Sequence, residues 1–444
     1  ATRAALAACV ILGTLVSRPG PLRAQGRADS LRLTFAEARS LAFRANPDLR
    51  AARLDTAVAR GELRQAGLLL RFNPTAEVLG AGGGNGTEAG FSQEVELFNQ
   101  QGARRSAGRA GLARARAGVA NSTRLIIGEV ERAFYRLVGA TRRSALADEV
   151  LGFNRRLAHV AGRQLQEGEI NRLEYNLTTI ELGRSRSRAL VARREREQGN
   201  IEMRSLLGLP QATVIVPVTD SSLIPLPPDS TAAVSLAAID AGAAATAAAP
   251  GLELSVDSLT ALALAQRPDL AERTAAIRQA EAQATAARRE ALPNLVVRGT
   301  SEREAGETRA FRPGVGLTLP LFNRNQGEVE ARRAAAEQAA FERAALRTRV
   351  RAEVTGAVAA YRAAAVEVAV LEATVLLPAR QNRQLLERAY REGKIGLPEL
   401  LLIRNQATEA ELDYWEAWLA VREARATIAE ATGQNLSAPA SGAP

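Results

Sequence analysis

The chain has 444 residues, of which 24% are charged, 46% hydrophobic and 4% aromatic, with a formal net charge of +10; this length favours two domains or one internal duplication, and an alanine-rich chain favours helices. A single cysteine, Cys9, excludes a disulfide scaffold, and the lack of about 18 uninterrupted strongly apolar internal residues argues against a helical membrane protein. The positive charge is nearly all arginine, interleaved with glutamate as in residues 193–197, which is typical of a solvated helix face and argues against a nucleic-acid partner.

The N-terminal segment, residues 1–26, is predicted to be a secretory signal peptide. Arg3 precedes an apolar stretch over residues 4–16, and small residues follow near Ala24. These are the three parts of such a peptide, so the segment is left out of the fold. The residues before Cys9 also resemble a lipoprotein cleavage box, but this match is weaker because the apolar run continues beyond the cysteine.

The chain repeats itself at an offset of about 220 to 226 residues. Five landmarks recur in the same order: 46–49 with 267–270, 97–99 with 321–323, 134–136 with 360–362, 167–170 with 392–395, and 207–208 with 432–433. The order predicts two repeats, residues 27–210 and 253–434. Residues 211–252, rich in proline and alanine, are predicted to be a linker, and residues 435–444 a disordered tail.

The first repeat is predicted to open with a helix that Thr34 and Glu37 cap and that ends near Leu70. Two extended segments, about 75–81 and 89–98, flank a glycine-rich tip at residues 82–86. A long helix over about 102–166, nearly 100 Å at about 1.5 Å per residue, turns at Gly168 into a return helix that ends at Leu207.

The second repeat is predicted to follow the same plan. A helix spans about 257–290, extended segments lie near 294–304 and 311–322, and a long helix covers about 326–391, bent or broken at Pro378. The return helix follows Pro398.

The extended segments alternate as membrane β-strands do. Apolar side chains occupy every second position, Val315, Leu317, Leu319 and Leu321, and are predicted to face lipid. Half of the ten phenylalanines lie in or beside these segments, where an interfacial aromatic girdle would lie: Phe72, Phe91, Phe98, Phe311 and Phe322. Four strands cannot close a barrel, and open edges are not tolerated in lipid, so three chains would share twelve strands. The alternative is a pair of soluble hairpins packed on helices.

The residue types exclude most catalytic chemistry. The chain has one histidine, His159, and one methionine, Met203, so no His/Cys set can bind a transition metal at the usual spacing. No phosphate-binding glycine loop, Ser/His/Asp set or Cys/His pair is found. We therefore expect no enzyme activity, no cofactor and no metal site.

Two motifs carry a resemblance to a known family. Residues 319–327, LPLFNRNQG, and residues 391–395, REGKI, followed by Glu399-Leu400-Leu401, resemble the TolC-type outer-membrane factors, or outer membrane efflux proteins. The first motif is especially similar to the branch that serves cobalt–zinc–cadmium and copper efflux (CzcC-like). Residues 98–102 of the first repeat lack the proline that this branch motif would place before them.

The resemblance implies a mainly helical fold with a small β part. In the family, three chains form a twelve-stranded outer-membrane barrel and a helical periplasmic tunnel. A periplasmic adaptor joins the tunnel to an inner-membrane pump, which is expected to be of the RND type. The expected function is passive export, with divalent metal cations as cargo and drugs or secreted substrates as the alternative. A periplasmic adaptor or a coiled-coil scaffold is the alternative from another class.

The resemblance also assigns sites. Gly168 and Gly393 are expected at the periplasmic hairpin tips, where the adaptor would dock. Glu399 and Glu174, each six residues after its tip glycine, are expected to form an acidic constriction. The alternative is that both are acids at helix N-termini, where the helix dipole favours them by about 0.3–1 kcal/mol.

Overall fold

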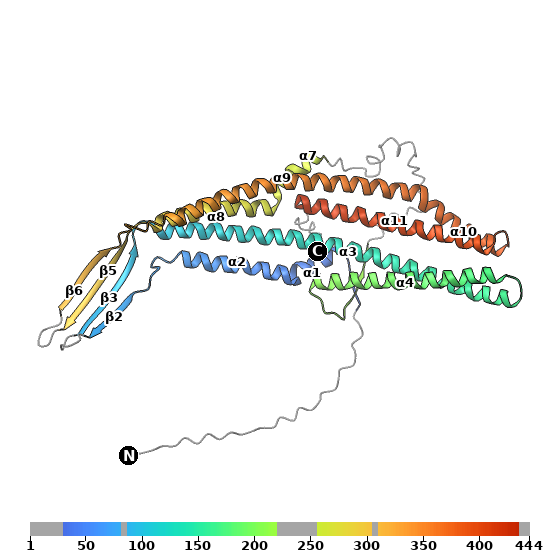
Figure 1. The fold of residues 1–444 in the computed structure, drawn as a ribbon, viewed down its shortest axis with the longest axis horizontal. Coiled ribbons are helices and arrows are strands. Elements are labelled where there is room, and N and C mark those ends of the chain that lie inside the picture. The colour runs from blue at the N-terminus through green and yellow to red at the C-terminus, as the bar shows by residue number, and fades with distance from the viewer. Residues whose placement is uncertain (1–29, 81–86, 220–254, 304–309, 435–444) are drawn as a thin grey trace, which may run out of the picture.

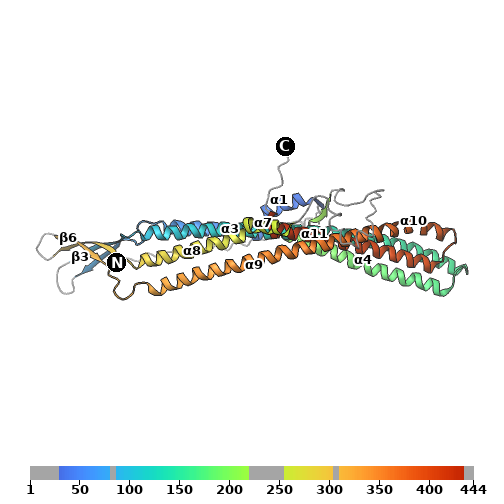
Figure 2. The same cartoon turned by 90° about the horizontal axis from the view of Figure 1, so that it is seen from above.

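The computed structural model describes residues 30–80, 87–219, 255–303 and 310–434. The predicted signal peptide with Cys9, the glycine-rich tip at 82–86, residues 220–252 of the predicted linker and the predicted tail lie outside these ranges. Figures 1 and 2 show an elongated molecule with a sheet at one end. At the other end lie the turns of two helical hairpins, which join α3 (Gln100–Gln166) to α4 (Arg172–Leu207) and α10 (Leu377–Arg391) to α11 (Leu397–Thr432).

The long helices and strands follow one order twice, and among the described elements β1 and β4 occur only in the first set. The first set is β1 (Ser30–Leu33), α1 (Phe35–Ala45), α2 (Pro47–Ala66), β2 (Thr75–Gly80), β3 (Thr87–Glu96), α3 (Gln100–Gln166), α4 (Arg172–Leu207) and β4 (Val214–Pro217). The second set is α7 (Val256–Gln266), α8 (Pro268–Glu290), β5 (Asn294–Arg303), β6 (Ala310–Leu317), α9 (Gln326–Val370), a π-helix (Leu371–Leu376), α10 (Leu377–Arg391) and α11 (Leu397–Thr432). Residues 214–217, placed in the predicted linker, instead pair in parallel with β1.

The first helix of each repeat is broken, where the sequence predicted one continuous helix. Asn46 separates α1 from α2: its Nδ2 donates to the carbonyl oxygen of Leu206 at 2.9 Å, and its Oδ1 accepts from the amide of Leu49 at 2.8 Å. Proline follows at the first position of α2 and of α8, and disfavours helical backbone in the residue before it. Asn46 therefore caps α2 and also binds the end of α4.

The second long helix changes its winding beside Pro378. The predicted bend is a π-helix over Leu371–Leu376, and Pro378 lies in the first turn of α10. A wider turn relieves the clash between a proline ring and the preceding carbonyl groups. Within the described residues, the run Gln326–Arg391 is the one helix with an 18-residue window apolar enough to cross a membrane, at mean hydropathy 1.5.

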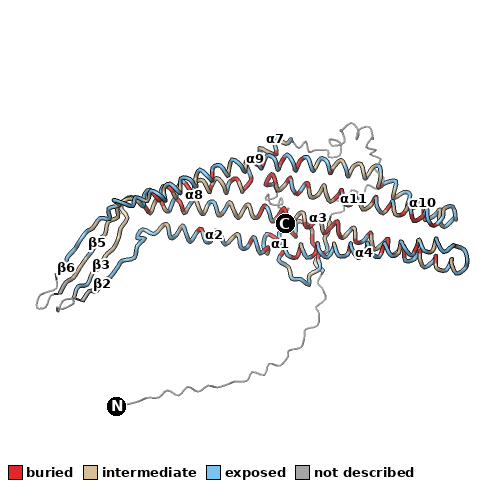
Figure 3. The backbone as a smooth tube through the Cα atoms, in the orientation of Figure 1, coloured by how far each residue is buried: buried red, intermediate tan, exposed pale blue. Residues whose placement is uncertain are grey.

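The core lies midway along the molecule and is built around α3 (Figure 3). Phe134, Leu137 and Met203 are fully buried where α1, α3 and α4 meet. Tyr135 and Trp418 pack edge to face with ring centroids 6.0 Å apart and join α3 to α11. The aromatic side chains are concentrated in this cluster. Elsewhere, small buried alanines let the helices approach closely, so few aromatics are needed to fill the core.

Candidate functional site

The four long strands form one antiparallel sheet in the order β2-β3-β5-β6. The register places Phe91 opposite Gly299, Val297 opposite Val315, and Leu295 opposite Leu317. Directly paired residues share a face, so one face of the sheet carries Ala76, Val78, Ala89, Phe91, Val95, Leu295, Val297, Phe311, Val315 and Leu317. Gln93 and Ser301 are the polar residues on this face whose side chains the structure describes, and the face is otherwise apolar along all four strands.

The opposite face is polar. It carries Thr75, Glu77, Ser92, Glu94, Arg298, Thr300 and Arg312, with Val296 as the apolar exception. No described residue of the four strands is buried in the single chain (Figure 3), and Val315 is 79% exposed. A two-faced sheet with an uncovered apolar side suits lipid on one side and water on the other.

The last strand is shorter than the sequence predicted. It ends at Leu317, so Leu319 and Leu321 lie in the connection to α9 and not on a lipid-facing strand. The physical reason is the partner strand: β5 begins at Asn294, whose carbonyl oxygen accepts from the amide of Thr318 at 3.0 Å, and no strand continues beyond it. The prediction that the strand continues through residue 321 is therefore wrong.

The five phenylalanines lie at two levels of the sheet. Phe91 and Phe311 are within strands, and the ring of Phe311 covers Gly299, where an added Cβ would meet it at 2.9 Å. Phe72, Phe98 and Phe322 are exposed in the connections between the strands and the helices. The second group marks the level where the sheet ends.

The two hairpin tips have the same backbone geometry. Gly168 has φ of +77° and Gly393 has φ of +68°, in the left-handed region that favours glycine. The next amide closes each turn: Glu169 donates to the carbonyl of Gln164 at 2.8 Å, and Lys394 to that of Ala389 at 2.9 Å. No atom lies within 4 Å of a Cβ added at either glycine, so both tips are open.

The two predicted constriction acids differ in their surroundings. Glu174 takes part in a capping box: it accepts from the amide of Asn171 at 3.2 Å and donates its own amide to the Asn171 side chain at 2.9 Å. Glu399 lies in the first turn of α11, exposed, on a helix with no side-chain cap. Capping occupies Glu174, whereas the Glu399 carboxylate is available.

The two helical hairpins pack against each other near their tips. Leu157 of α3 contacts a buried cluster with Leu386, Leu397, Leu400 and Leu401 from α10 and α11. Tyr390 of α10 and Leu177 of α4 pack against this cluster. Burial raises the pKa of Tyr390, and the nearby charge of Glu174 raises it further.

An acidic face runs along α11, and the sequence analysis missed it beyond its first member. Glu399, Glu409, Asp413 and Glu416 are all exposed and fall within about 100° of arc around the helix. We call these four residues the α11 acidic face. Glu411 lies outside it and pairs with Arg383 at 3.4 Å. The spacing alone, read at 100° per residue, could have revealed this face in a chain of net charge +10.

A buried ion-pair network joins four helices at the core. Arg267, 4% exposed, contacts Asp269 at 2.7 Å and Glu353 of α9 at 2.5 Å, and donates to the carbonyl oxygen of Ala431 at 3.2 Å. Arg124 of α3 lies 3.6 Å from Asp269. Burial alone would raise the pKa of Asp269, but the hydrogen bond and charge of Arg267 hold it below the usual range of a carboxyl group. The Asp269 carboxylate is therefore ionised at neutral pH, and its contribution to stability is lost as the pH falls through this lowered pKa.

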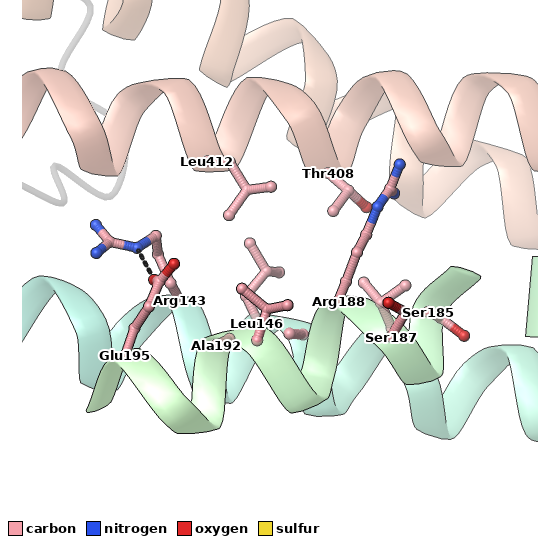
Figure 4. A pocket seen from close by; sticks show the side chains of 12 residues that line it. Arg143, Leu146, Ser185, Ser187, Arg188, Ala192, Glu195, Thr408 and Leu412 are labelled. Atoms are coloured by element: carbon pink, nitrogen blue, oxygen red, sulfur yellow. Dashed lines mark ion pairs between the residues drawn. The ribbon is translucent and has the colours of Figure 1, made fainter. Parts of the chain in front are cut away.

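A hollow of about 280 Å³ lies between α3, α4 and α11 (Figure 4). Its floor is apolar, with Leu146 and Leu412 facing each other, and Arg143 pairs with Glu195 at 3.5 Å at its edge. No group of three or more His, Cys, Asp or Glu that could hold a metal ion occurs among the described residues.

Comparison with known proteins places this fold. The sequence model of the outer membrane efflux protein family matches residues 259–434, which cover most of the second repeat. No curated protein sequence matches the chain.

Three solved structures illustrate the likeness in fold. The outer membrane channel CmeC of Campylobacter jejuni matches with a TM-score of 0.71 and 16% identity, over 91% of this chain and 86% of that one. CusC matches with a TM-score of 0.66 and 19% identity, over 90% and 91% of the two chains. The MtrE outer membrane channel of Neisseria gonorrhoeae matches with a TM-score of 0.66 and 19% identity, over 91% and 90%. At these identities the likeness establishes the fold.

Proposed function

We propose that the chain is a channel of the outer membrane efflux protein type and that three copies form a passive export duct across the outer membrane. The match of residues 259–434 to the model of that family supports this proposal. The two-faced sheet carries this proposal. Its four strands cannot close alone, and unpaired edges are not tolerated in lipid. Three chains supply twelve strands with the apolar face toward lipid and the polar face toward the lumen.

In this arrangement the helices form a periplasmic tunnel, and the tips at Gly168 and Gly393 point toward the inner membrane. A periplasmic adaptor docks at these tips, and an RND-type pump delivers the cargo. The open space around both glycines supports close approach of a partner backbone.

We expect Gly168→Val with Gly393→Val to abolish export while trimers still form. A β-branched residue in the left-handed region costs about 1–2 kcal/mol per site, which changes the shape of each turn without touching the core. Asparagine tolerates this backbone, so Gly168→Asn with Gly393→Asn is the matched control. Export assays and trimer recovery from the outer membrane measure the two effects, and normal export by the valine variant would refute docking at the tips.

The cargo proposed is divalent metal cations. The α11 acidic face supports it, because four exposed carboxylates on each of three chains would concentrate negative potential in a confined channel and favour cations. Glu399, at the tip end of this face, is the proposed constriction. Glu174 contributes at most a second, weaker ring, because it caps α4.

Single-channel recording of reconstituted trimers tests this role. Neutralising the α11 acidic face (Glu399→Gln, Glu409→Gln, Asp413→Asn, Glu416→Gln) should reduce cation selectivity and weaken block by divalent cations from the tip side. Four exposed acids near the sheet end serve as the charge-matched control: Asp55→Asn, Glu62→Gln, Glu281→Gln and Glu337→Gln. An equal loss of cation selectivity in both variants would mean that the α11 acidic face acts only as general surface charge.

Drug export is the alternative. A deletion strain should lose tolerance of zinc, cobalt, cadmium or copper and regain it with the intact chain. Unchanged metal tolerance with raised drug sensitivity would decide for the alternative.

A further inference from the structure

Two arginine-lined hollows lie where the helices meet the sheet. The first, about 450 Å³, is lined by Arg60, Leu63, Arg64, Gly67, Arg105 and Arg109, from the end of α2 and the start of α3. All four arginines are exposed, and none makes an ion pair or a side-chain hydrogen bond with the rest of the described chain. Four free guanidinium groups therefore surround one surface depression.

The second hollow occupies the corresponding place in the second repeat. It measures about 570 Å³ and is lined by Arg288, Ala291, Arg324, Gln326, Val329, Glu330 and Arg333, from α8, α9 and their connections. Arg64 lies three residues before the C-cap Gly67, and Arg288 three residues before the C-cap Ala291. An arginine therefore lies at the same position relative to the helix C-terminus in both repeats.

The charge around the first hollow is one-sided. From Gln100 to Gly128 the chain has six arginines and no acid, unlike the interleaved pattern at residues 193–197. The first turn of α3 also lacks an acidic residue, although a helix N-terminus favours negative charge. Arg104 pairs with Glu96 at 2.5 Å, but Arg105 and Arg109 have no such partner. An anion from outside the chain could therefore pair with Arg105 and Arg109 and interact favourably with the N-terminus of α3.

Exposed apolar side chains lie directly beside these arginines. Leu68, Leu69 and Leu70 follow the C-cap of α2, and Phe72, Phe98 and Phe322 lie in the same connections. Aromatic and aliphatic groups next to arginines are typical of the boundary between hydrocarbon and lipid head groups. The apolar groups reach the acyl chains, while the arginines reach the phosphates.

We propose that the two hollows bind the head groups of anionic phospholipids in the periplasmic leaflet of the outer membrane, one per hollow. This inference rests on the proposed placement of the sheet in that membrane, because it sets the hollows at the periplasmic end of the strands. The first hollow binds more tightly, since it presents four arginines and no acid, whereas Glu330 lines the second. The bound lipids fix the depth of the sheet in the bilayer.

Native mass spectrometry of the purified full-length protein, titrated with phosphatidylglycerol or phosphatidylcholine, tests the proposal. The wild type should bind phosphatidylglycerol more tightly than phosphatidylcholine. The variant Arg60→Gln, Arg64→Gln, Arg105→Gln, Arg109→Gln should bind phosphatidylglycerol at least about a hundredfold more weakly, since each arginine near an anionic surface contributes about a fivefold change in affinity. Binding of phosphatidylcholine should stay unchanged.

Four exposed, unpaired arginines far from the sheet provide the control: Arg155→Gln, Arg156→Gln, Arg186→Gln and Arg194→Gln. This variant should bind phosphatidylglycerol as the wild type does. If the quadruple variant fails to fold, Arg64→Gln with Arg109→Gln should still weaken the binding of phosphatidylglycerol by about 25-fold. Equal affinity for both lipids, unchanged binding by the arginine variants, or displacement by inorganic phosphate or a DNA duplex at equal concentration would overturn the assignment.

Membrane fractionation separates this inference from the proposed function. Outer-membrane trimers that bind phosphatidylglycerol and phosphatidylcholine equally would refute only the proposed head-group sites. Wild-type protein recovered as a soluble periplasmic chain would sink the proposed function itself.

Discussion

Replacing Val315 and Leu317 together by arginine should abolish recovery of the trimer from the outer membrane. Both side chains lie on the apolar face of the sheet, paired with Val297 and Leu295. An arginine that faces lipid costs about 2–4 kcal/mol at the middle of the bilayer, so two of them cost about 4–8 kcal/mol per chain. Three chains share one barrel in this proposal, which multiplies the cost. Outer-membrane fractionation and trimer yield measure the effect.

The same strand provides a control at the same depth. Gly316 lies between the two residues on the polar face, and a Cβ there would meet Val296 only at ordinary contact distance, 3.9 Å. Gly316→Arg, combined with Thr75→Arg on the polar face of β2, should leave assembly near the wild-type level. Normal trimers from the Val315/Leu317 variant, or equal failure of both variants, would show that the apolar face does not face lipid.

Arg267→Met should produce the largest loss of stability in the helical part, about 3–5 kcal/mol, because it removes one partner of a buried ion pair and leaves Asp269 with Arg124 alone, 3.6 Å away. Asp269 and Glu353 would lose their closest cation, and the Ala431 carbonyl at the end of α11 would lose its donor. The junction of α8, α9 and α11 would loosen as a result. Thermal unfolding of the detergent-solubilised protein, followed by circular dichroism, measures the shift in midpoint.

Arg273→Met is the matched control. Arg273 lies on α8, which Arg267 precedes, and also pairs with a glutamate of α9, Glu342, but its side chain is 43% exposed, against 3% for that of Arg267. Exposed ion pairs contribute about 0–1 kcal/mol, so its midpoint should move little. Similar shifts for Arg267→Met and Arg273→Met would mean that burial of the network does not decide its contribution to stability.

The sequence by itself determined the order of the long helices and of the four long strands, but not the β1–β4 pair or the break in the first helix of each repeat. Helix and strand follow from local periods of about 3.6 and 2 residues, and those periods are visible without any partner. The tip glycines were equally readable, because a left-handed turn favours the one residue without a Cβ. The boundary at Leu317 was not, since alternation continues through Leu321 and only the start of β5 at Asn294 ends the pairing.

Long-range contacts decided what remained. Asn46 reads as an ordinary cap residue until its amide meets the end of α4, 160 residues later. The arginines of the first hollow come from segments about 40 residues apart, so their shared surface has no local signature. Which of many charged residues are buried, paired or free depends on which helices meet. Tertiary packing decides which helices contact one another. The sequence shows the charge of a side chain but not which group of another helix faces it.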